Sequence, residues 1–185
     1  MLTEIDSRLL EKIADLTGKP VGAFNIRKDS GCEARQSTEH IEIVPQPEGK
    51  SGIIIRIKPG TKGEQCHIPV IISKTGLSEM VYNDFYVGDD CDVDIIAGCG
   101  IHNSGCDESR HDGIHTFHIG KNSKVRYVEK HFGEKDPGQT GGNIMNPKTV
   151  VYLGENATMQ METIQIRGID STKRYTKIVL SLIHI

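Results

Sequence analysis

The sequence predicts a mainly β protein, built as a β-helix or related β-solenoid, with one short N-terminal helix. Short runs of alternating apolar and polar residues are bounded by Gly, Pro, Asn and Asp, as expected of β-strands. A motif of Gly, two polar residues, a small residue and then alternating residues starts at Gly88, Gly120 and Gly154, with a weaker copy at Gly60. The glycines are 28, 32 and 34 residues apart, a period typical of stacked repeats.

The first twenty residues are expected to form the helix. One face carries apolar residues at helical spacing, namely Ile5, Leu9, Leu10, Ile13 and Leu16. Thr3 is the expected N-cap, with Asp6 three residues later, and Gly18-Lys19-Pro20 is expected to end the helix. We expect the apolar face to pack on the rest of the chain, because so short a helix is marginal alone.

Residues 21–185 are expected to form a single β-helix core. The clearest strand candidates are 41–44, 52–57, 68–72 and 81–87. Coils of such a fold stack about 4.8 Å apart, so residues far apart in sequence can meet in one site. Residues 137–142, Pro-Gly-Gln-Thr-Gly-Gly, predict an exposed loop between coils. Residues 179–185 form an apolar strand with no polar coil after it, which predicts a core that is incomplete at its C-terminus.

Composition limits the class of function. The 185 residues suffice for one domain, and a net charge of −3 disfavours a nucleic-acid partner. Five cysteines with irregular spacing predict no disulfide framework, which indicates the reducing cytoplasm. We find neither a signal peptide nor an apolar run of about 20 residues, so we expect no membrane-spanning role.

The chemistry-bearing segment holds six potential metal ligands within twenty residues. They are Cys99, His102, Cys106, His111, His115 and His118. Thiolate and imidazole groups bind soft and borderline metals, and the glycines beside the two cysteines would let a cluster or cofactor approach closely. The alternative is structural, with Cys99 as a small buried residue and the histidines as hydrogen-bonded groups.

Strand parity separates the histidines of this segment. His115 and His118 would face opposite sides of a regular strand, whereas His111 and His115 would face the same side. His131 follows a coil end and could equally be exposed. Cys91 occupies the small-residue position of its repeat, which favours packing. The sequence contains no Walker A loop, so this chain itself is not expected to bind ATP.

Several segments together resemble the SufB/SufD family, in its short form from anaerobic bacteria and archaea. The most specific are Val81-Tyr-Asn-Asp-Phe-Tyr-Val-Gly88, Ile96-Ala-Gly-Cys-Gly-Ile-His-Asn103 and His111-Asp-Gly-Ile-His115. The resemblance continues through Gly22–Asp29, Lys58–Glu64, Val125–His131, Ile144–Thr149 and Met161–Thr163. It covers the chain from about Leu2 to Thr176.

The resemblance implies a right-handed β-helix that serves the SUF system as a scaffold for iron–sulfur cluster assembly, and not as an enzyme. It implies two partners, a SufC-like ABC ATPase and a second SufB/SufD-like subunit in a homo- or heterodimer. The cluster would be transient, assembled on the complex. Cys99 resembles a family cysteine implicated in sulfur handling, and His111 resembles a histidine that follows it. Family members are longer, and their later coils and ATPase-docking helices have no counterpart in this sequence.

The implied chemistry assigns sulfur and cluster handling to Cys99 and Cys106. A thiolate would accept sulfur as a persulfide and then bind iron. Cations lower a thiol pKa, and Arg110 and His102 are the local candidates for this effect on Cys99. The metal ligands expected from the sequence are Cys99, His102, His111 and His115.

Two other functions remain open from the sequence. One is a zinc-type metalloenzyme in which His111, His115 and Cys99 or Cys106 hold the ion, with Glu108 as general base. The other is a purely structural interaction module on a β-solenoid, in which the cysteines and histidines are replaceable without loss of partner binding.

Overall fold

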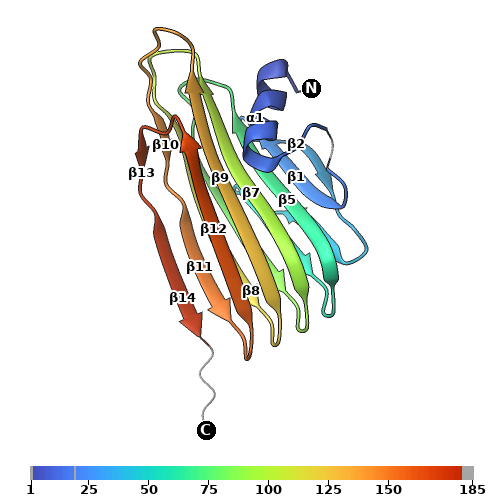
Figure 1. The fold of residues 1–185 in the computed structure, drawn as a ribbon. Coiled ribbons are helices and arrows are strands. Elements are labelled where there is room, and N and C mark those ends of the chain that lie inside the picture. Colours follow the sequence, from blue (N-terminus) through green and yellow to red (C-terminus); the bar gives the residue numbers. More distant parts are fainter. Residues whose placement is uncertain (1, 19, 181–185) are drawn as a thin grey trace.

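The computed structural model describes residues 2–18 and 20–180. Two facing β-sheets are joined into a β-solenoid of about four turns, and one helix lies on an outer face (Figure 1). The elements are α1 (Glu4–Ala14), β1 (Ala23–Lys28), β2 (Gly31–Gln36), β3 (Ile41–Pro45), β4 (Gly52–Ile57), β5 (Lys62–Ile72), β6 (Ser78–Val87), β7 (Asp92–Asn103), β8 (Ser109–Ile119), β9 (Lys124–Lys135), β10 (Asn143–Met145), β11 (Lys148–Leu153), β12 (Thr158–Arg167), β13 (Ser171–Thr172) and β14 (Tyr175–Leu180). The four strands expected from the sequence fall within β3, β4, β5 and β6, and residues 137–142 form a loop between β9 and β10, as expected.

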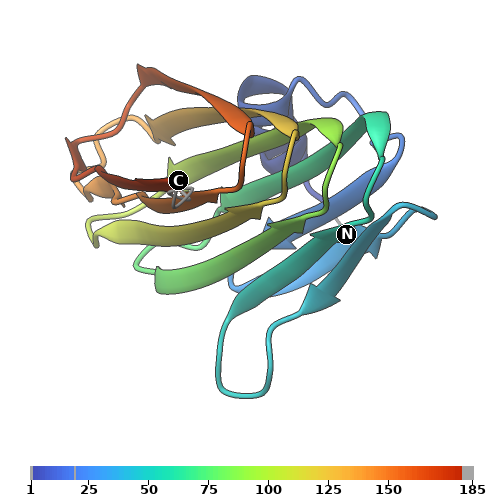
Figure 2. The same cartoon turned by 90° about the horizontal axis from the view of Figure 1, so that it is seen from below.

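The middle turns of the solenoid give one strand to each sheet, β5 and β6 and then β7 and β8, as can be followed from below in Figure 2. The last two turns each give two short strands to the second sheet, β10 with β11 and β13 with β14. The first sheet has the order β12-β9-β7-β5-β1-β2. The second has the order β13-β10-β8-β6-β4-β3, and β11 pairs with both β8 and β14. Neighbouring coils pair in parallel, so equivalent residues of successive turns lie side by side.

The strand register confirms the repeat and corrects its first copy. Lys62 pairs with Asp92, Asp92 with Lys124 and Lys124 with Thr158, so successive turns contain 30, 32 and 34 residues. Gly88, Gly120 and Gly154 are equivalent, but the position equivalent to them in the first turn is Lys58, because Ile57 pairs with Val87.

Gly60 belongs to a different position of the repeat. It lies three residues after Ile57, as Asp90, Asn122 and Asn156 lie three residues after their own strand ends. All four have positive φ, at 76°, 57°, 54° and 54°. Gly, Asn and Asp tolerate the left-handed region, so one tight corner recurs with the residue types that permit it.

The N-terminal edge of the solenoid consists of antiparallel hairpins. β1 pairs with β2 and β3 with β4 in antiparallel fashion, whereas β1–β5 and β4–β6 are parallel. Within the expected core of residues 21–185, β1 and β4 therefore belong to the parallel stack, and β2 and β3 form an antiparallel edge on it.

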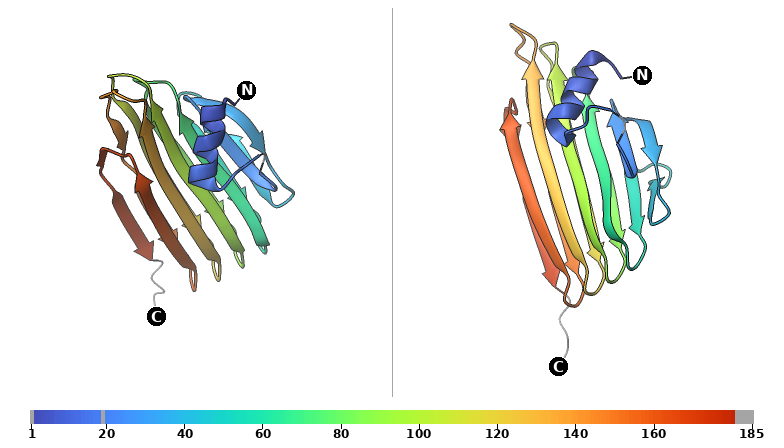
Figure 3. Two further views of the ribbon diagram at one scale, coloured as in Figure 1. Left: turned by 45° about the horizontal axis from the view of Figure 1, so that its top comes forward. Right: turned by 45° about the vertical axis from the view of Figure 1, so that its right-hand side comes forward.

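α1 covers the outer face of the first sheet over β5, β7 and β9 (Figures 1 and 3). Thr3 is its N-cap and forms a capping box with Asp6, as expected. The helix ends at Ala14, earlier than expected, because Asp15 takes a left-handed conformation and its N–H donates to the last helical carbonyls. Leu9, Leu10 and Ile13 are buried beneath it.

The space between the sheets is apolar near the corners that follow β6, β8 and β11, at Gly88, Gly120 and Gly154. Phe85 and Phe117 stack there at 4.1 Å, and Tyr127 packs edge-on against Phe117 at 5.1 Å. Further along the same strands the interior becomes polar, and this change of character defines the candidate site.

No helix among the described residues is long and apolar enough to cross a membrane. Strand β14 leaves Tyr175, Ile178 and Leu180 largely exposed, at 53%, 58% and 63%. The rest of the apolar C-terminal segment, residues 181–185, lies outside the described residues.

Candidate functional site

The structure brings together three of the sequence-predicted site residues. Cys99, His111 and His115 line one cavity between the sheets, together with Glu129 and His131. These five residues are called the interior chamber below. Its volume of about 20 Å³ matches one water molecule or one ion. Strand parity explains the set, because His111 and His115 both face inward from β8, as expected.

Strand register also links the chamber residues of β7 and β9. Cys99 pairs with His131, and Ala97 pairs with Glu129. His131, which from the sequence alone could equally have been exposed, is buried, and Glu129 was not among the predicted site residues. A signal for His131 nevertheless exists in the sequence. The spacing of 32 residues between Gly88 and Gly120, added to Cys99, gives His131. The repeat period, applied to the cysteine, would have found its neighbour.

A buried carboxylate holds His111. Nδ1 of His111 lies 2.8 Å from Oε1 of Glu79. Arg27 and Ser30 both donate to Oε2 of Glu79, at 3.0 and 2.9 Å. Burial alone would raise the pKa of Glu79, but His111 and Arg27 outweigh it and lower the pKa to about 2. The carboxylate is therefore charged and fixes the orientation of the imidazole.

A second buried carboxylate, Glu129, lies between two imidazoles. Its Oε1 is 3.7 Å from Nε2 of His115 and 3.6 Å from Nε2 of His131. Arg174 donates to Oε2 at 3.0 Å, and the Tyr127 hydroxyl donates to Oε1 at 3.1 Å. Burial would raise the pKa of Glu129, but His131, His115 and Arg174 lower it well below its usual range. Burial lowers the pKa of His115 to about 4, so its imidazole is neutral at pH 7.

Cys99 is a protonated, shielded thiol at rest. It is 3% exposed, and burial, together with the charges of Glu79 and Glu129, raises its pKa well above the usual value. The expectation that Arg110 and His102 activate this thiol is wrong. Arg110 pairs with Asp112, and His102 contacts Glu134 and Asp136 at 3.0 and 3.3 Å.

The glycines beside Cys99 serve the helix and not a cofactor. A Cβ at Gly98 would lie 2.5 Å from the carbonyl oxygen of Ile13, and one at Gly100 would lie 3.2 Å from Leu9. A side chain at Gly98 would therefore collide with the helix backbone, and one at Gly100 would crowd Leu9.

Two expected ligands lie outside the chamber. His102 does not line it, and its contacts with Glu134 and Asp136 join a surface network that includes Arg8. Cys106 is exposed in the loop between β7 and β8, with its thiol 3.8 Å from the Gln139 amide oxygen. The expected metal set of Cys99, His102, His111 and His115 is thus divided, as is the sulfur pair of Cys99 and Cys106. Cys91 is buried, in keeping with its predicted packing role.

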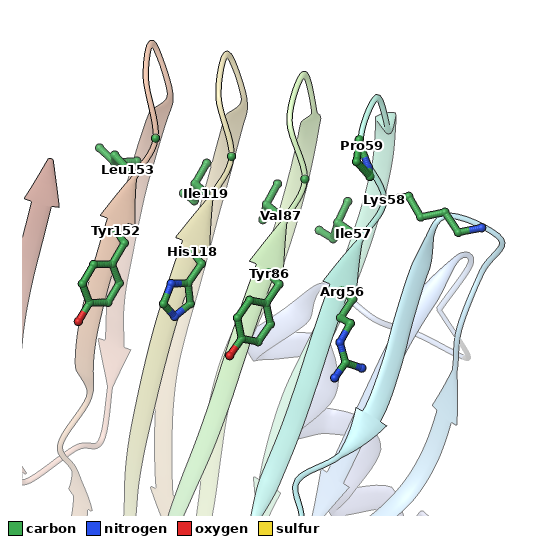
Figure 4. Close-up of a pocket in the computed structure, with 13 residues that line it drawn as sticks. Arg56, Ile57, Lys58, Pro59, Tyr86, Val87, His118, Ile119, Tyr152 and Leu153 are labelled. Atoms are coloured by element: carbon green, nitrogen blue, oxygen red, sulfur yellow. The ribbon is translucent and has the colours of Figure 1, made fainter. Parts of the chain in front are cut away.

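His118 faces away from the chamber, as parity predicted, and belongs to an outer groove (Figure 4). It stacks between Tyr86 and Tyr152, at 5.0 and 4.9 Å. The groove runs between this aromatic row and the corners at Gly88, Gly120 and Gly154, and its volume is about 640 Å³.

Among residues 2–18 and 20–180, no three His, Cys, Asp or Glu side chains converge as a ready-made metal centre. The chamber instead offers a shielded thiol, three imidazoles and the charged carboxylate of Glu129, with a second charged carboxylate, Glu79, bonded to His111. Such a set can store a reactive sulfur species away from water, or bind a soft cation after side-chain rotation.

No protein-family model, no curated protein and no solved structure matches the chain.

Proposed function

We propose that this chain is a scaffold subunit for iron–sulfur cluster assembly of the SUF type. The observation that carries the proposal is the shielded Cys99 thiol within the interior chamber, at the centre of a segment that resembles the SufB/SufD family. A scaffold must hold sulfur where water and oxidants do not reach it, and the interior of a solenoid provides such a place.

The chemistry begins with sulfur transfer to Cys99. The thiolate attacks the outer sulfur of a donor persulfide, so a new S–S bond forms on Cys99 while the donor S–S bond breaks. The donor leaves as a thiolate, and no net oxidation occurs. Iron and sulfide then enter as cargo, and the neighbouring imidazoles are suited to bind iron.

The resting thiol does not fit this step, because its pKa is raised and its surface is covered. Transfer therefore requires the solenoid to open or shift at the chamber. A SufC-like ABC ATPase as partner, with a second SufB/SufD-like subunit, would supply that movement. The ATP is bound by the partner and not by this chain.

The test is sulfur loading by a cysteine desulfurase with cysteine under anaerobic conditions, with the ATPase and MgATP present. Peptide mass spectrometry locates any added sulfur. We expect one added sulfur on Cys99 in the wild type and in Cys106→Ala, and none in Cys99→Ala. Sulfur on Cys106 or Cys32 alone would refute the role of Cys99.

A further inference from the structure

Three histidines of the interior chamber share one arrangement, in which one ring nitrogen faces a buried carboxylate. Nδ1 of His111 is hydrogen-bonded to Glu79 at 2.8 Å. Nε2 of His115 and Nε2 of His131 both face Glu129, at 3.7 and 3.6 Å. Histidines that bind metals use one ring nitrogen for the ion and donate the other N–H to a carboxylate, which fixes the tautomer.

In two of these rings, the nitrogen that faces away from the carboxylate has no hydrogen-bond partner within the described part of the chain. Nδ1 of His115 and Nδ1 of His131 are buried and have no hydrogen-bond partner among the described residues. Unpaired buried polar atoms are costly, so two in one cavity call for an explanation.

Gly113 lies between His111 and His115 along β8, where the two imidazole rings approach the strand closely. It alternates with His111 and His115 on the inner face of β8, and a Cβ at this position would lie 3.3 Å from Nε2 of His111 and 2.9 Å from Nε2 of His115. The missing side chain therefore lets the His111 and His115 rings pack closely over this point of the strand, with Nε2 of His115 turned towards it and Nδ1 on the other side of the ring. Cys99 completes the lining from the opposite sheet, in register with His131.

We propose that the interior chamber is a binding site for a single divalent transition-metal ion of the zinc or ferrous class. The ligands are the imidazoles of His111, His115 and His131 together with the Cys99 thiolate. Glu79 and Glu129 orient the imidazoles and do not bind the ion.

Size and charge agree with this assignment. The cavity of about 20 Å³ admits one ion without its hydration shell. Arg27 and Arg174 pair with Glu79 and Glu129, and deprotonation of Cys99 offsets one of the two positive charges that the ion adds. The four side chains do not converge in their present rotamers, so binding requires rotation of the side chains onto the ion.

This site does not depend on the proposed scaffold function. A resident ion would bind to the isolated chain without sulfide, ATP or a partner subunit. Failure of cluster assembly would leave it standing, and failure of ion binding would leave the persulfide chemistry of Cys99 standing.

The test is anaerobic titration of the full chain with Co²⁺, followed by displacement with Zn²⁺. Visible absorption reports the tetrahedral d–d bands and the thiolate-to-cobalt charge-transfer band, and elemental analysis gives the stoichiometry. The variants are His115→Gln, His131→Gln and Cys99→Ser. The matched controls are His118→Gln, on the outer face of the same strand as His115, and Cys106→Ser, an exposed thiol. Circular dichroism checks the fold of each variant.

We expect one Co²⁺ per wild-type chain, with both bands. Each histidine variant should bind at least about tenfold more weakly, since even outer-shell changes cost 10–100-fold in metal affinity. Cys99→Ser should lose the charge-transfer band, and this readout carries the test if a histidine variant fails to fold. The controls should bind as the wild type does. No binding by the wild type, or binding that ignores these three variants, would overturn the proposal and leave the cavity to water.

Discussion

The five cysteines of this chain have very different surroundings. Cys32 and Cys106 are exposed, whereas Cys66, Cys91 and Cys99 are buried. Burial raises the pKa of Cys66 to about 12, and burial with two nearby carboxylates raises that of Cys99 well above its usual value. Since the thiolate is the reactive form, the cysteine with the proposed function is also one of the least reactive at rest.

Alkylation rates test this contrast between the cysteines. In the native protein at pH 8 without partner or nucleotide, iodoacetamide should modify Cys32 and Cys106 quickly. The three buried thiols should react only after unfolding in urea. Mass spectrometry of timed peptide digests gives the rate at each position. Labelling of Cys99 as fast as Cys106 would contradict the shielded chamber.

Strand parity and the repeat period differ in which site residues they predict. Parity along β8 correctly separated His115 from His118 and grouped His111 with His115. Proximity in sequence grouped His102 and Cys106 with Cys99, but the structure places both outside the chamber. His102 has the opposite parity to Cys99 along β7, and Cys106 lies in the loop that follows this strand. The partners of Cys99 lie one coil away, so only the repeat period could reveal them.

At the scale of elements, the contact between α1 and β7 depends on Gly98. A Cβ there would lie 2.5 Å from the Ile13 carbonyl oxygen and 3.0 Å from that of Lys130, and neither backbone atom can move alone. We expect Gly98→Ala to lower the free energy of unfolding by about 1–3 kcal/mol. Urea denaturation measures the change.

Gly18→Ala is the control for this substitution. A Cβ at Gly18 would meet nothing within 4 Å, so we expect little change in stability. Equal stabilities of the Gly98→Ala variant and the wild type would contradict the close packing of α1 on β7.

The start of α1 gives a prediction on pH. Burial would raise the pKa of Asp6, but the ion pair with Lys28 and hydrogen bonds from Thr3 lower it below 3.8. The stabilisation from Asp6 is therefore full above its unfolded pKa and is lost as the pH falls through its folded pKa. Asp6→Asn should cost about 1 kcal/mol at pH 7, and this deficit should shrink below pH 4.

Urea unfolding at several pH values checks the role of Asp6. Glu11→Gln makes the same charge change on an exposed position of α1, so its deficit should stay small throughout. A deficit of Asp6→Asn that does not change with pH would contradict an ionised Asp6 at the helix start.

Elements were predicted unevenly because local patterns do not encode which strands pair. Apolar residues at helical spacing predicted α1, and alternation of apolar and polar residues predicted β3 to β6. The hairpin of β1 and β2 was missed, although Asp29 and Ser30, with φ of 45° and 68°, form a turn suited to antiparallel strands. The Asp-Ser-Gly run was a usable signal for it.

At the scale of the whole molecule, stacking converts sequence period into spatial proximity. The recurrent corners align the start of each turn, and the number of residues in the turn determines which side chains meet inside. Phe85, Phe117 and Tyr127 thereby form an apolar layer, and strands β7, β8 and β9 place Cys99, His111 and Glu129 in the chamber. The fold class followed from the repeat, whereas the make-up of the site required the register of every coil.

The measurement that tests the central claim most directly is anaerobic reconstitution with iron and sulfide in the presence of the partner ATPase and MgATP, which the shielded chamber requires. Iron and acid-labile sulfide are counted on the full chain, on Cys99→Ala and on the control Cys106→Ala. We predict iron and sulfide in comparable amounts on the wild type and on Cys106→Ala, and loss of both from Cys99→Ala. Sulfide and iron retained in full by a folded Cys99→Ala variant would contradict the account.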